Sequence, residues 1–327
     1  MKNHDDTHRN KQKAISLMNK YGSEQIPFLF VIDFEMHAPI VLTEKEIHKN
    51  HICFSLEAEK AKPIQKEISF KTFPVEFEKY AEAFEYVVNQ ISLGNSYLTN
   101  LTFPTKLETN LTLDEIYTHS FARYKLLLEN KFVVFSPECF VKIENGIISS
   151  YPMKGTIDAS IPNAEQIILA DEKEMAEHIT IVDLIRNDLS IAAKNVRVEK
   201  FRYIDTIETN KKTLLQVSSK IVGELGEDYQ QKIGDILFSM LPAGSISGAP
   251  KKKTVEIIKH AEKIERGYYT GVFGYYDGKN LDSAVMIRFI EQTVEGLFYR
   301  SGGGITFMSD VNSEYQELID KVYVPFT

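Results

Sequence analysis

The chain has 327 residues, of which 43% are hydrophobic and 26% charged, as is usual for a water-soluble globular protein. A net charge of -8 provides no basic field for a phosphate backbone or an anionic lipid surface, which argues against nucleic-acid and membrane partners. Cys53 and Cys139 are the only cysteines, and residues 1–13 are polar and contain no apolar signal segment. We therefore expect a cytoplasmic protein without a disulfide framework.

Helices and strands follow one another along the chain without a linker or repeat. Apolar residues recur every three or four positions over residues 76–93, which predicts an amphipathic helix ending before Gly94. Two more helices are predicted at residues 164–194 and 250–266. Residues 131–152 and 268–307 are rich in β-forming residues interrupted by Gly-containing turns. Short turns join antiparallel strands, so the predicted fold class is α+β in one domain.

The first predicted hairpin turns at Asn145-Gly146 and pairs Glu144 with Ile147. Extended without a bulge, this register places Glu138 opposite Met153 and therefore about one residue from Lys154. An exposed cross-strand ion pair between Glu138 and Lys154 is the simpler interpretation of that spacing. A ligand site is the alternative, because Gly155 and Thr156 leave the backbone open to close approach.

The second predicted hairpin turns at Glu295-Gly296 and pairs Val294 with Leu297. In this register Arg288 faces Gly303. Three consecutive glycines, Gly302 to Gly304, destabilise a strand and are expected only where another group approaches the backbone closely. An arginine opposite them offers donors to a carboxylate. A bulge beside a surface arginine explains the same pattern.

Two pairs of glutamates have helical spacing. Glu174 and Glu177 are three residues apart, as are Glu314 and Glu317, so each pair shares one helix face. Carboxylates that repel one another are stabilised by Mg²⁺, which prefers oxygen ligands, although solvated charged faces are also common.

Two other kinds of site are disfavoured. The glycine-rich segment at residues 244–251 lacks the spacing of a phosphate-binding P-loop. A pyridoxal phosphate on Lys154 would need an accompanying glycine-rich phosphate site, and none follows this lysine.

Eight segments in collinear order resemble the chorismate-binding family, which includes anthranilate, isochorismate, salicylate and aminodeoxychorismate synthases. They are SPECF (136–140), YPMKGT (151–156), EMAEHITIVDLIRNDL (174–189), LPAGSISGAPK (241–251), YYTGVFGYYD (268–277), DSAVMIRF (282–289), SGGGI (301–305) and SEYQELIDK (313–321). The resemblance implies one chorismate-binding domain over residues 1–327, with a divergent part at 1–75 and a motif-bearing core at 76–327. It also implies antiparallel β-sheets packed face to face, helices outside, and an active site in the cleft between the halves.

The resemblance assigns roles to matching positions. Glu138 and Lys154 are the catalytic residues it implies, with Glu138 as general acid and base. The Mg²⁺ ligands that it implies are Glu174, Glu177, Glu314 and Glu317. The substrate-binding residues that it implies are Gly155, Thr156, Tyr275, Arg288, Gly302, Gly303, Gly304 and Lys321.

Three positions separate the reactions of the family. Leu98 stands where isochorismate and salicylate synthases have a water-activating lysine, and leucine cannot activate water. The form PxKGT around Lys154 is typical of aminodeoxychorismate synthases, in which the lysine is proposed to attack the ring. An attacking amine must be neutral, so we expect a lowered pKa for Lys154. Gln216 replaces a histidine that is linked to pyruvate elimination in anthranilate synthases.

The resemblance therefore favours component I of an aminodeoxychorismate synthase, which makes 4-amino-4-deoxychorismate for 4-aminobenzoate and folate synthesis from chorismate and ammonia. Cys53 and Cys139 lack the context of a glutaminase nucleophile, so a separate glutamine amidotransferase subunit is expected in a heterodimer. The alternatives are anthranilate synthase component I and, in another class, an inactive scaffold that activates a glutaminase subunit.

Overall fold

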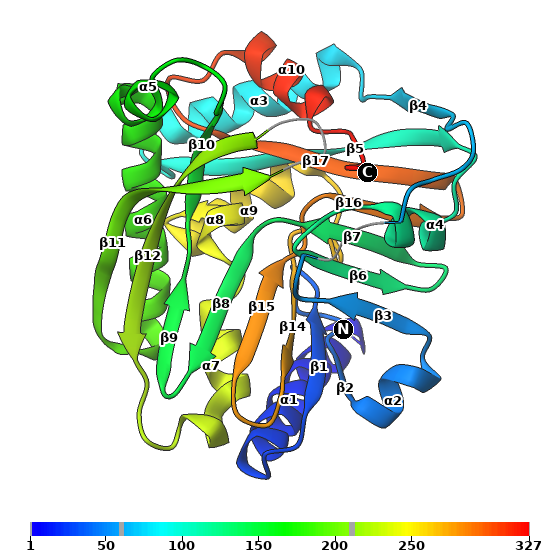
Figure 1. Cartoon of the computed structure of the whole chain (residues 1–327), viewed down its shortest axis with the longest axis vertical. Coiled ribbons are helices and arrows are strands. Elements are labelled where there is room, and N and C mark those ends of the chain that lie inside the picture. Colours follow the sequence, from blue (N-terminus) through cyan, green and yellow to red (C-terminus); the bar gives the residue numbers. More distant parts are fainter. Residues whose placement is uncertain (1, 59–61, 209–212, 327) are drawn as a thin grey trace.

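Two antiparallel sheets organise the computed structural model, which describes residues 2–58, 62–208 and 213–326 (Figure 1). In the first sheet the strand order is β10-β12-β9-β8-β15-β14-β1-β2, and β11 pairs with β12. These strands are β1 (Phe28–Ile32), β2 (Ile40–Thr43), β8 (Cys139–Glu144), β9 (Ile147–Ser150), β10 (Met153–Asp158), β11 (Lys194–Glu208), β12 (Thr213–Glu224), β14 (Val272–Tyr276) and β15 (Leu281–Val285).

The second sheet has the order β13-β5-β17-β16-β7-β6-β3, and β4 pairs with β5. Its strands are β3 (Ile52–Ser55), β4 (Phe70–Phe73), β5 (Leu98–Thr109), β6 (Tyr124–Leu128), β7 (Phe132–Ser136), β13 (Gly248–Ala249), β16 (Phe289–Thr293) and β17 (Gly296–Ile305). Between β7 and β8, and again between β15 and β16, the chain crosses from one sheet to the other.

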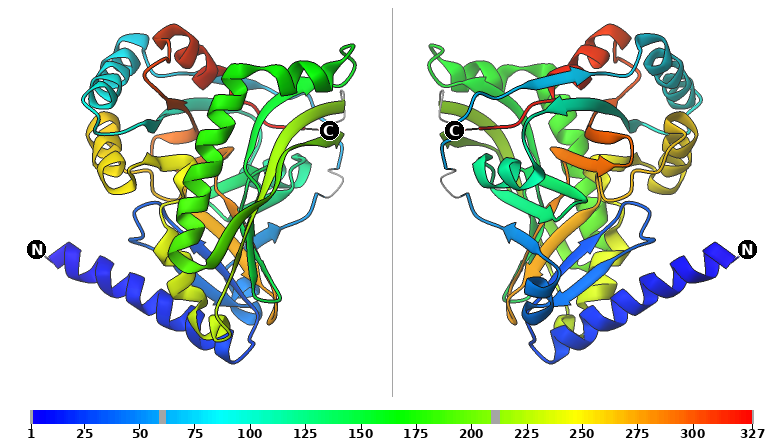
Figure 2. Two further views of the ribbon diagram at one scale, coloured as in Figure 1. Left: turned by 90° about the vertical axis from the view of Figure 1, so that its left-hand side faces the viewer. Right: turned by 90° about the vertical axis from the view of Figure 1, so that its right-hand side faces the viewer.

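Helices cover the outer faces of both sheets (Figure 2). They are α1 (Lys2–Ser23), α2 (Glu44–Lys49), α3 (Phe77–Ser92), α4 (Leu113–His119), α5 (Ala164–Ala170), α6 (Glu172–Ala192), α7 (Ile233–Met240), α8 (Gly244–Ser247), α9 (Lys251–Glu262) and α10 (Val311–Asp320), with a 3-10 turn at Tyr229–Lys232. Within the described ranges, no helix is both long and apolar enough to cross a membrane.

Apolar side chains fill the space between the two sheets. Leu29, Val31 and Phe273 of the first sheet belong to one buried cluster with Leu126 and Val134 of the second. A further cluster packs α3, α9 and α10 onto β5 and β17, and another packs α1, α6 and α7 onto the first sheet. The predicted α+β class, with sheets face to face and helices outside, is confirmed.

The predicted helices form with small changes in their ends. The first is α3, and the third is α9, which ends at Glu262 because Lys263 adopts a left-handed conformation. The second stretch divides into α5 and α6 at Asp171. Asp171 leaves helical geometry and accepts a hydrogen bond from the Glu174 amide at 2.9 Å, which starts α6.

The first hairpin register is confirmed beside its turn, where Glu144 pairs with Ile147. It is wrong further along, because β9 ends at Ser150 and the chain then leaves β8. Met153 pairs with Ser218 of β12 instead of facing Glu138. Neither the predicted contact between Glu138 and Lys154 nor a cross-strand ion pair between them forms.

The second hairpin register is wrong by two residues. Val294 and Glu295 form the turn, Thr293 pairs with Gly296, and Gly303 pairs with Leu101 of β5. Gly296 has a φ of 118°, a conformation that favours glycine and places it at the end of the turn. Arg288 therefore does not face Gly303 across this hairpin.

Candidate active site

Lys154 lies on β10, with its Nζ 2.6 Å from Oε2 of Glu177 on α6. Burial acts to lower the pKa of the amine, but the hydrogen bond and charge of Glu177, with the fields of Glu174 and Glu317, raise it overall. Lys154 is therefore a cation in this arrangement. The expected lowering of its pKa is wrong here, because carboxylates surround the amine.

The four glutamates lie on two helices that are distant in sequence. Glu174 and Glu177 are near the start of α6, which begins beside α5 at the upper end of the molecule in Figure 1. Glu314 and Glu317 are on α10, which lies at that same end. The charge of Lys154 acts on Glu174 and on Glu317, so this amine lies near carboxylates of both helices. The tertiary fold thus brings both pairs to one site.

Glycines allow the carboxylates to approach the backbone. A Cβ on Gly155 would lie 3.1 Å from Glu174 Oε2, and a Cβ on Gly303 would lie 3.0 Å from Glu314 Oε2. Gly155 also has a φ of 85°, which residues with a side chain rarely adopt. These two glycines therefore belong to the carboxylate site through their missing side chains.

The donor set has the chemistry that Mg²⁺ requires. Glu174 Oε2 is buried without a hydrogen-bond partner, and burial raises the pKa of both Glu174 and Glu314. In the described part of the chain, however, no three acidic, histidine or cysteine side chains converge as a metal site. The amines of Lys154 and Lys321 instead neutralise Glu177 and Glu317.

Lys321 links the carboxylates to the glycine-rich strand. Its Nζ lies 2.5 Å from Glu317 Oε1 and donates a hydrogen bond to the Gly302 carbonyl at 2.8 Å. Burial acts to raise the pKa of Glu317, but Lys321 and Lys154 lower it overall. The predicted residues Gly302 and Lys321 are therefore in contact.

Glu138 lies where the chain crosses between the sheets from β7 to β8, and Arg288 lies where it crosses from β15 to β16. The Val285 amide donates a hydrogen bond to the Glu138 carbonyl at 3.1 Å, and the Phe135 amide donates one to the Arg288 carbonyl at 3.1 Å. Burial raises the pKa of Glu138, whereas Ser245, Arg288 and Lys321 act to lower it. A carboxyl with a raised pKa suits a general acid near neutral pH.

Arg288 is held on the same side of the site by the C-terminal segment. Its guanidinium lies 5.0 Å from the ring centre of Tyr323 and donates a hydrogen bond to the Lys321 carbonyl at 3.5 Å. Its backbone has a φ of 54°, which is uncommon for a residue with a Cβ. Arg288, Lys321 and Glu138 thus form a second group of charges beside the carboxylates.

The structure does not bring every predicted residue to this group. Tyr275 donates a hydrogen bond to Glu44 at 2.6 Å and packs against Phe54, and its described contacts include none of the predicted site residues. Thr156 accepts a hydrogen bond from Gln216 at 3.5 Å, which places both beside Lys154 on neighbouring strands. Gly304 lies beside Leu98, because a Cβ on Gly304 would meet the Leu98 side chain at 3.0 Å.

Sequence reasoning missed two residues near Glu138 and Arg288. Ser245 donates a 2.6 Å hydrogen bond to Glu138 Oε1, and its glycine-rich segment could have pointed to it. Tyr269 is buried, and burial raises its pKa to about 12 although the charge of Arg288 acts to lower it. Tyr269 is thus one of three tyrosines near Arg288, with Tyr299 and Tyr323, and motif spacing alone could not have found this group.

The family model of the chorismate binding enzymes matches residues 29–326. The chain belongs to this family. A PabA-like protein of Haemophilus influenzae is 50% identical over 317 residues, covering 96% of this chain and 97% of that protein. Aminodeoxychorismate synthase component 1 of Bacillus subtilis is 30% identical over 265 residues, covering 76% of this chain but 55% of that protein.

Two solved structures of other synthases have a similar fold. Anthranilate synthase component I of Streptococcus pneumoniae superposes with a TM-score of 0.64 at 25% identity, over 80% of this chain and 60% of that one. MenF, the menaquinone-specific isochorismate synthase of Escherichia coli, gives a TM-score of 0.69 at 15% identity, over 97% and 81% of the two chains. The MenF likeness concerns the fold alone.

Proposed function

We propose that this chorismate-binding enzyme is component I of an aminodeoxychorismate synthase, which converts chorismate and ammonia to 4-amino-4-deoxychorismate and water. The observation that carries the proposal is the position of the Lys154 amine, 2.6 Å from Glu177 and within the fields of Glu174 and Glu317. A lysine at this place can reach a substrate held beside the carboxylates. Leu98 and Gln216 support the proposal, because neither can activate water or shuttle a proton as lysine and histidine can.

In the proposed reaction Lys154 loses a proton to solvent water, and the neutral amine attacks ring carbon C2. The C2–N bond forms as the C4–O bond breaks, and the hydroxyl leaves as water with the proton of Glu138. Ammonia then forms a C4–N bond while the C2–N bond breaks. This second step returns a proton to Glu138 and frees the Lys154 amine, which regains its proton from solvent water.

Binding of the dianionic substrate falls to the positive and backbone groups around these residues. Arg288 and Lys321 are placed to attract carboxylates, and the backbone at Gly302 and Gly303 can come close to the ligand. Glu174, Glu177, Glu314 and Glu317 would hold Mg²⁺, which when bound would neutralise them and fix the ring carboxylate.

The chain itself has no suitable glutaminase nucleophile. A glutaminase cysteine acts as a thiolate, but burial raises the pKa of the Cys139 thiol to about 12 and also raises that of Cys53. These are the only cysteines of the sequence. We therefore propose that ammonia is free or comes from a separate glutamine amidotransferase subunit, and that two unpaired thiols fit a cytoplasmic location.

The test is incubation with chorismate, ammonium and Mg²⁺, followed by mass analysis of the products and of the protein. Wild type should yield 4-amino-4-deoxychorismate without pyruvate, and glutamine should not replace ammonium for the isolated chain. Lys154→Ala should lower kcat at least about 100-fold, as expected when a nucleophile is lost.

Lys220→Ala is the matched control, because Lys220 is also a partly exposed strand lysine paired with a glutamate, Glu199, at 2.5 Å. It should retain wild-type activity. Anthranilate with pyruvate as products would favour anthranilate synthase component I, and activation of a glutaminase without any turnover of chorismate would favour the scaffold. Full activity of Lys154→Ala would refute the nucleophile.

A further inference from the structure

A four-residue helix, α8, carries the hydroxyl that contacts the proposed general acid. Ser245 Oγ donates to Glu138 Oε1 at 2.6 Å, a short distance typical of a hydrogen bond to a carboxylate. A helix this short has no stability of its own in water. The position of the Ser245 hydroxyl therefore depends on the contacts that hold its neighbours, Gly244 and Ile246.

Asp188 holds the residue before Ser245. The Gly244 amide donates to Asp188 Oδ2 at 2.8 Å, and Lys251 Nζ donates to Asp188 Oδ1 at 2.6 Å and to the Met240 carbonyl at 2.6 Å. A Cβ on Gly244 would lie 2.9 Å from Asp188 Oδ2, so only glycine permits this approach. A charged pair thus fixes the start of α8 to α6 and α9.

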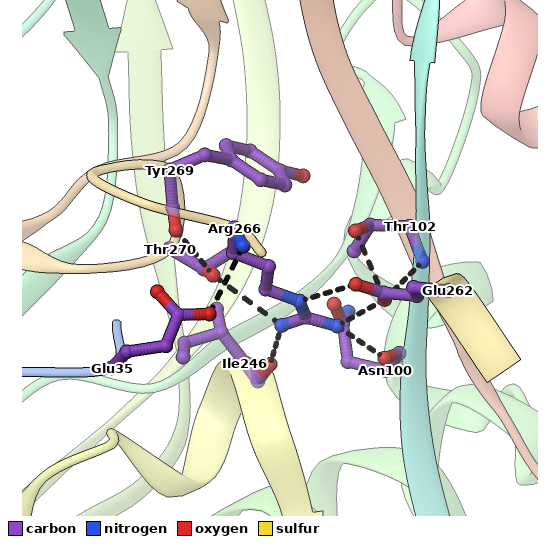
Figure 3. A network of polar contacts seen from close by, with 8 residues as sticks. All are labelled: Glu35, Asn100, Thr102, Ile246, Glu262, Arg266, Tyr269 and Thr270. Atoms are coloured by element: carbon purple, nitrogen blue, oxygen red, sulfur yellow. Dashed lines mark hydrogen bonds and ion pairs between the residues drawn. The ribbon is translucent and has the colours of Figure 1, made fainter. Parts of the chain in front are cut away.

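Arg266 holds the residue after Ser245. Its Nη1 donates to the Ile246 carbonyl at 2.9 Å, while Nε and Nη2 donate to Glu262 at 3.0 and 2.6 Å (Figure 3). Both charged side chains are almost fully buried, with exposed fractions of 0% and 1%. The backbone is therefore anchored by a buried charge on each side of Ser245.

We propose that Ser245 is a positioning residue that orients the Glu138 carboxyl toward the substrate, with α8 fixed for this purpose by Asp188 at Gly244 and Arg266 at Ile246. The inference rests on the proposed function, because it takes Glu138 as the general acid. A carboxyl group can rotate about its terminal bond, and one strong hydrogen bond selects a single orientation. The oxygen that Ser245 does not contact is then free for proton transfer.

Ser245→Ala removes this hydrogen bond, and Ser247→Ala is the matched control. Ser247 is buried in the same helix, but its hydroxyl donates to the Ala243 carbonyl at 2.8 Å. Loss of an orienting contact lowers rate more than binding, so Ser245→Ala should reduce kcat for chorismate consumption about 10- to 100-fold with KM changed less than about threefold. Ser245→Thr, which keeps the hydroxyl, should restore most of the rate.

The pH dependence of kcat/KM tests this role, because a purely structural role of Ser245 would leave it unchanged. The Ser245 hydrogen bond and the charges of Arg288 and Lys321 favour the ionised form of Glu138. Without the Ser245 hydroxyl, the pKa of Glu138 should rise by about one unit, which shifts the basic limb of kcat/KM to higher pH. Ser247→Ala should leave the limb in place.

A measurement that needs no turnover separates this inference from the proposed function. Carbon-13 NMR titration of the glutamate carboxyls, with the Glu138 signal identified by its loss in Glu138→Gln, should show the same upward shift in Ser245→Ala only. Conversion of chorismate to another product would refute the proposed function and leave this comparison intact. A kcat within twofold of wild type, an unmoved Glu138 titration, or an equal loss in Ser247→Ala would overturn the role of Ser245.

Discussion

Arg266→Met should strongly destabilise the protein. All five N–H donors of Arg266 are used, because its guanidinium makes two hydrogen bonds to Glu262 and one each to Asn100, Ile246 and Thr270 (Figure 3). Methionine keeps much of the apolar stem but leaves the buried Glu262 carboxylate without its cation. Breaking one side of a buried pair costs about 3–5 kcal/mol, so we expect a loss of about 4 kcal/mol in the free energy of unfolding.

Urea unfolding at pH 7, followed by circular dichroism, measures this loss. Lys253→Met is the control, because Lys253 pairs with Glu256 on the exposed face of the same helix, α9, and should cost less than about 1 kcal/mol. Removing both partners in Arg266→Met/Glu262→Leu should be less damaging than the sum of the single changes, because no unpaired charge remains. A loss below about 1 kcal/mol for Arg266→Met would refute the reasoning.

Three further predictions concern the carboxylate site and its surroundings. Mg²⁺ should raise the thermal unfolding midpoint of wild type, and EDTA should reverse this rise. Glu174→Gln should weaken Mg²⁺ binding, measured by calorimetry, on the order of tenfold. Equal affinities of wild type and Glu174→Gln would exclude Glu174 as a ligand. Gly303→Ala should also weaken Mg²⁺ binding, because its Cβ would meet Glu314 Oε2 at 3.0 Å, and an unchanged affinity would contradict that contact. Burial lowers the pKa of His178 from 6.5 to about 4. The unfolded chain therefore protonates this histidine at a higher pH than the folded chain does. Stability is lost as pH falls from 6.5 to 4, by at most about 3 kcal/mol. Urea midpoints of His178→Asn should show a shallower fall over this range, and parallel falls would rule out His178 as the cause.

The sequence by itself determined the features that depend on near neighbours. Helical periodicity located α3, and Pro250 at the start with Gly267 after the end located α9. The spacing of three residues placed Glu174 with Glu177 on one helix face. The Asn145-Gly146 turn fixed the register next to it. These features follow from backbone geometry within a few residues, so a local pattern is sufficient to predict them.

Only the tertiary structure decided which of these features meet. Lys154 faces Glu177 because β10 leaves the predicted hairpin and pairs with β12, far along the chain. Glu138 contacts Ser245, 107 residues away, because the chain crosses between the sheets at Glu138. Such pairings depend on which apolar faces pack together, and many partners satisfy the same local pattern. Motif spacing therefore supplied the reacting groups, and sheet packing selected their neighbours.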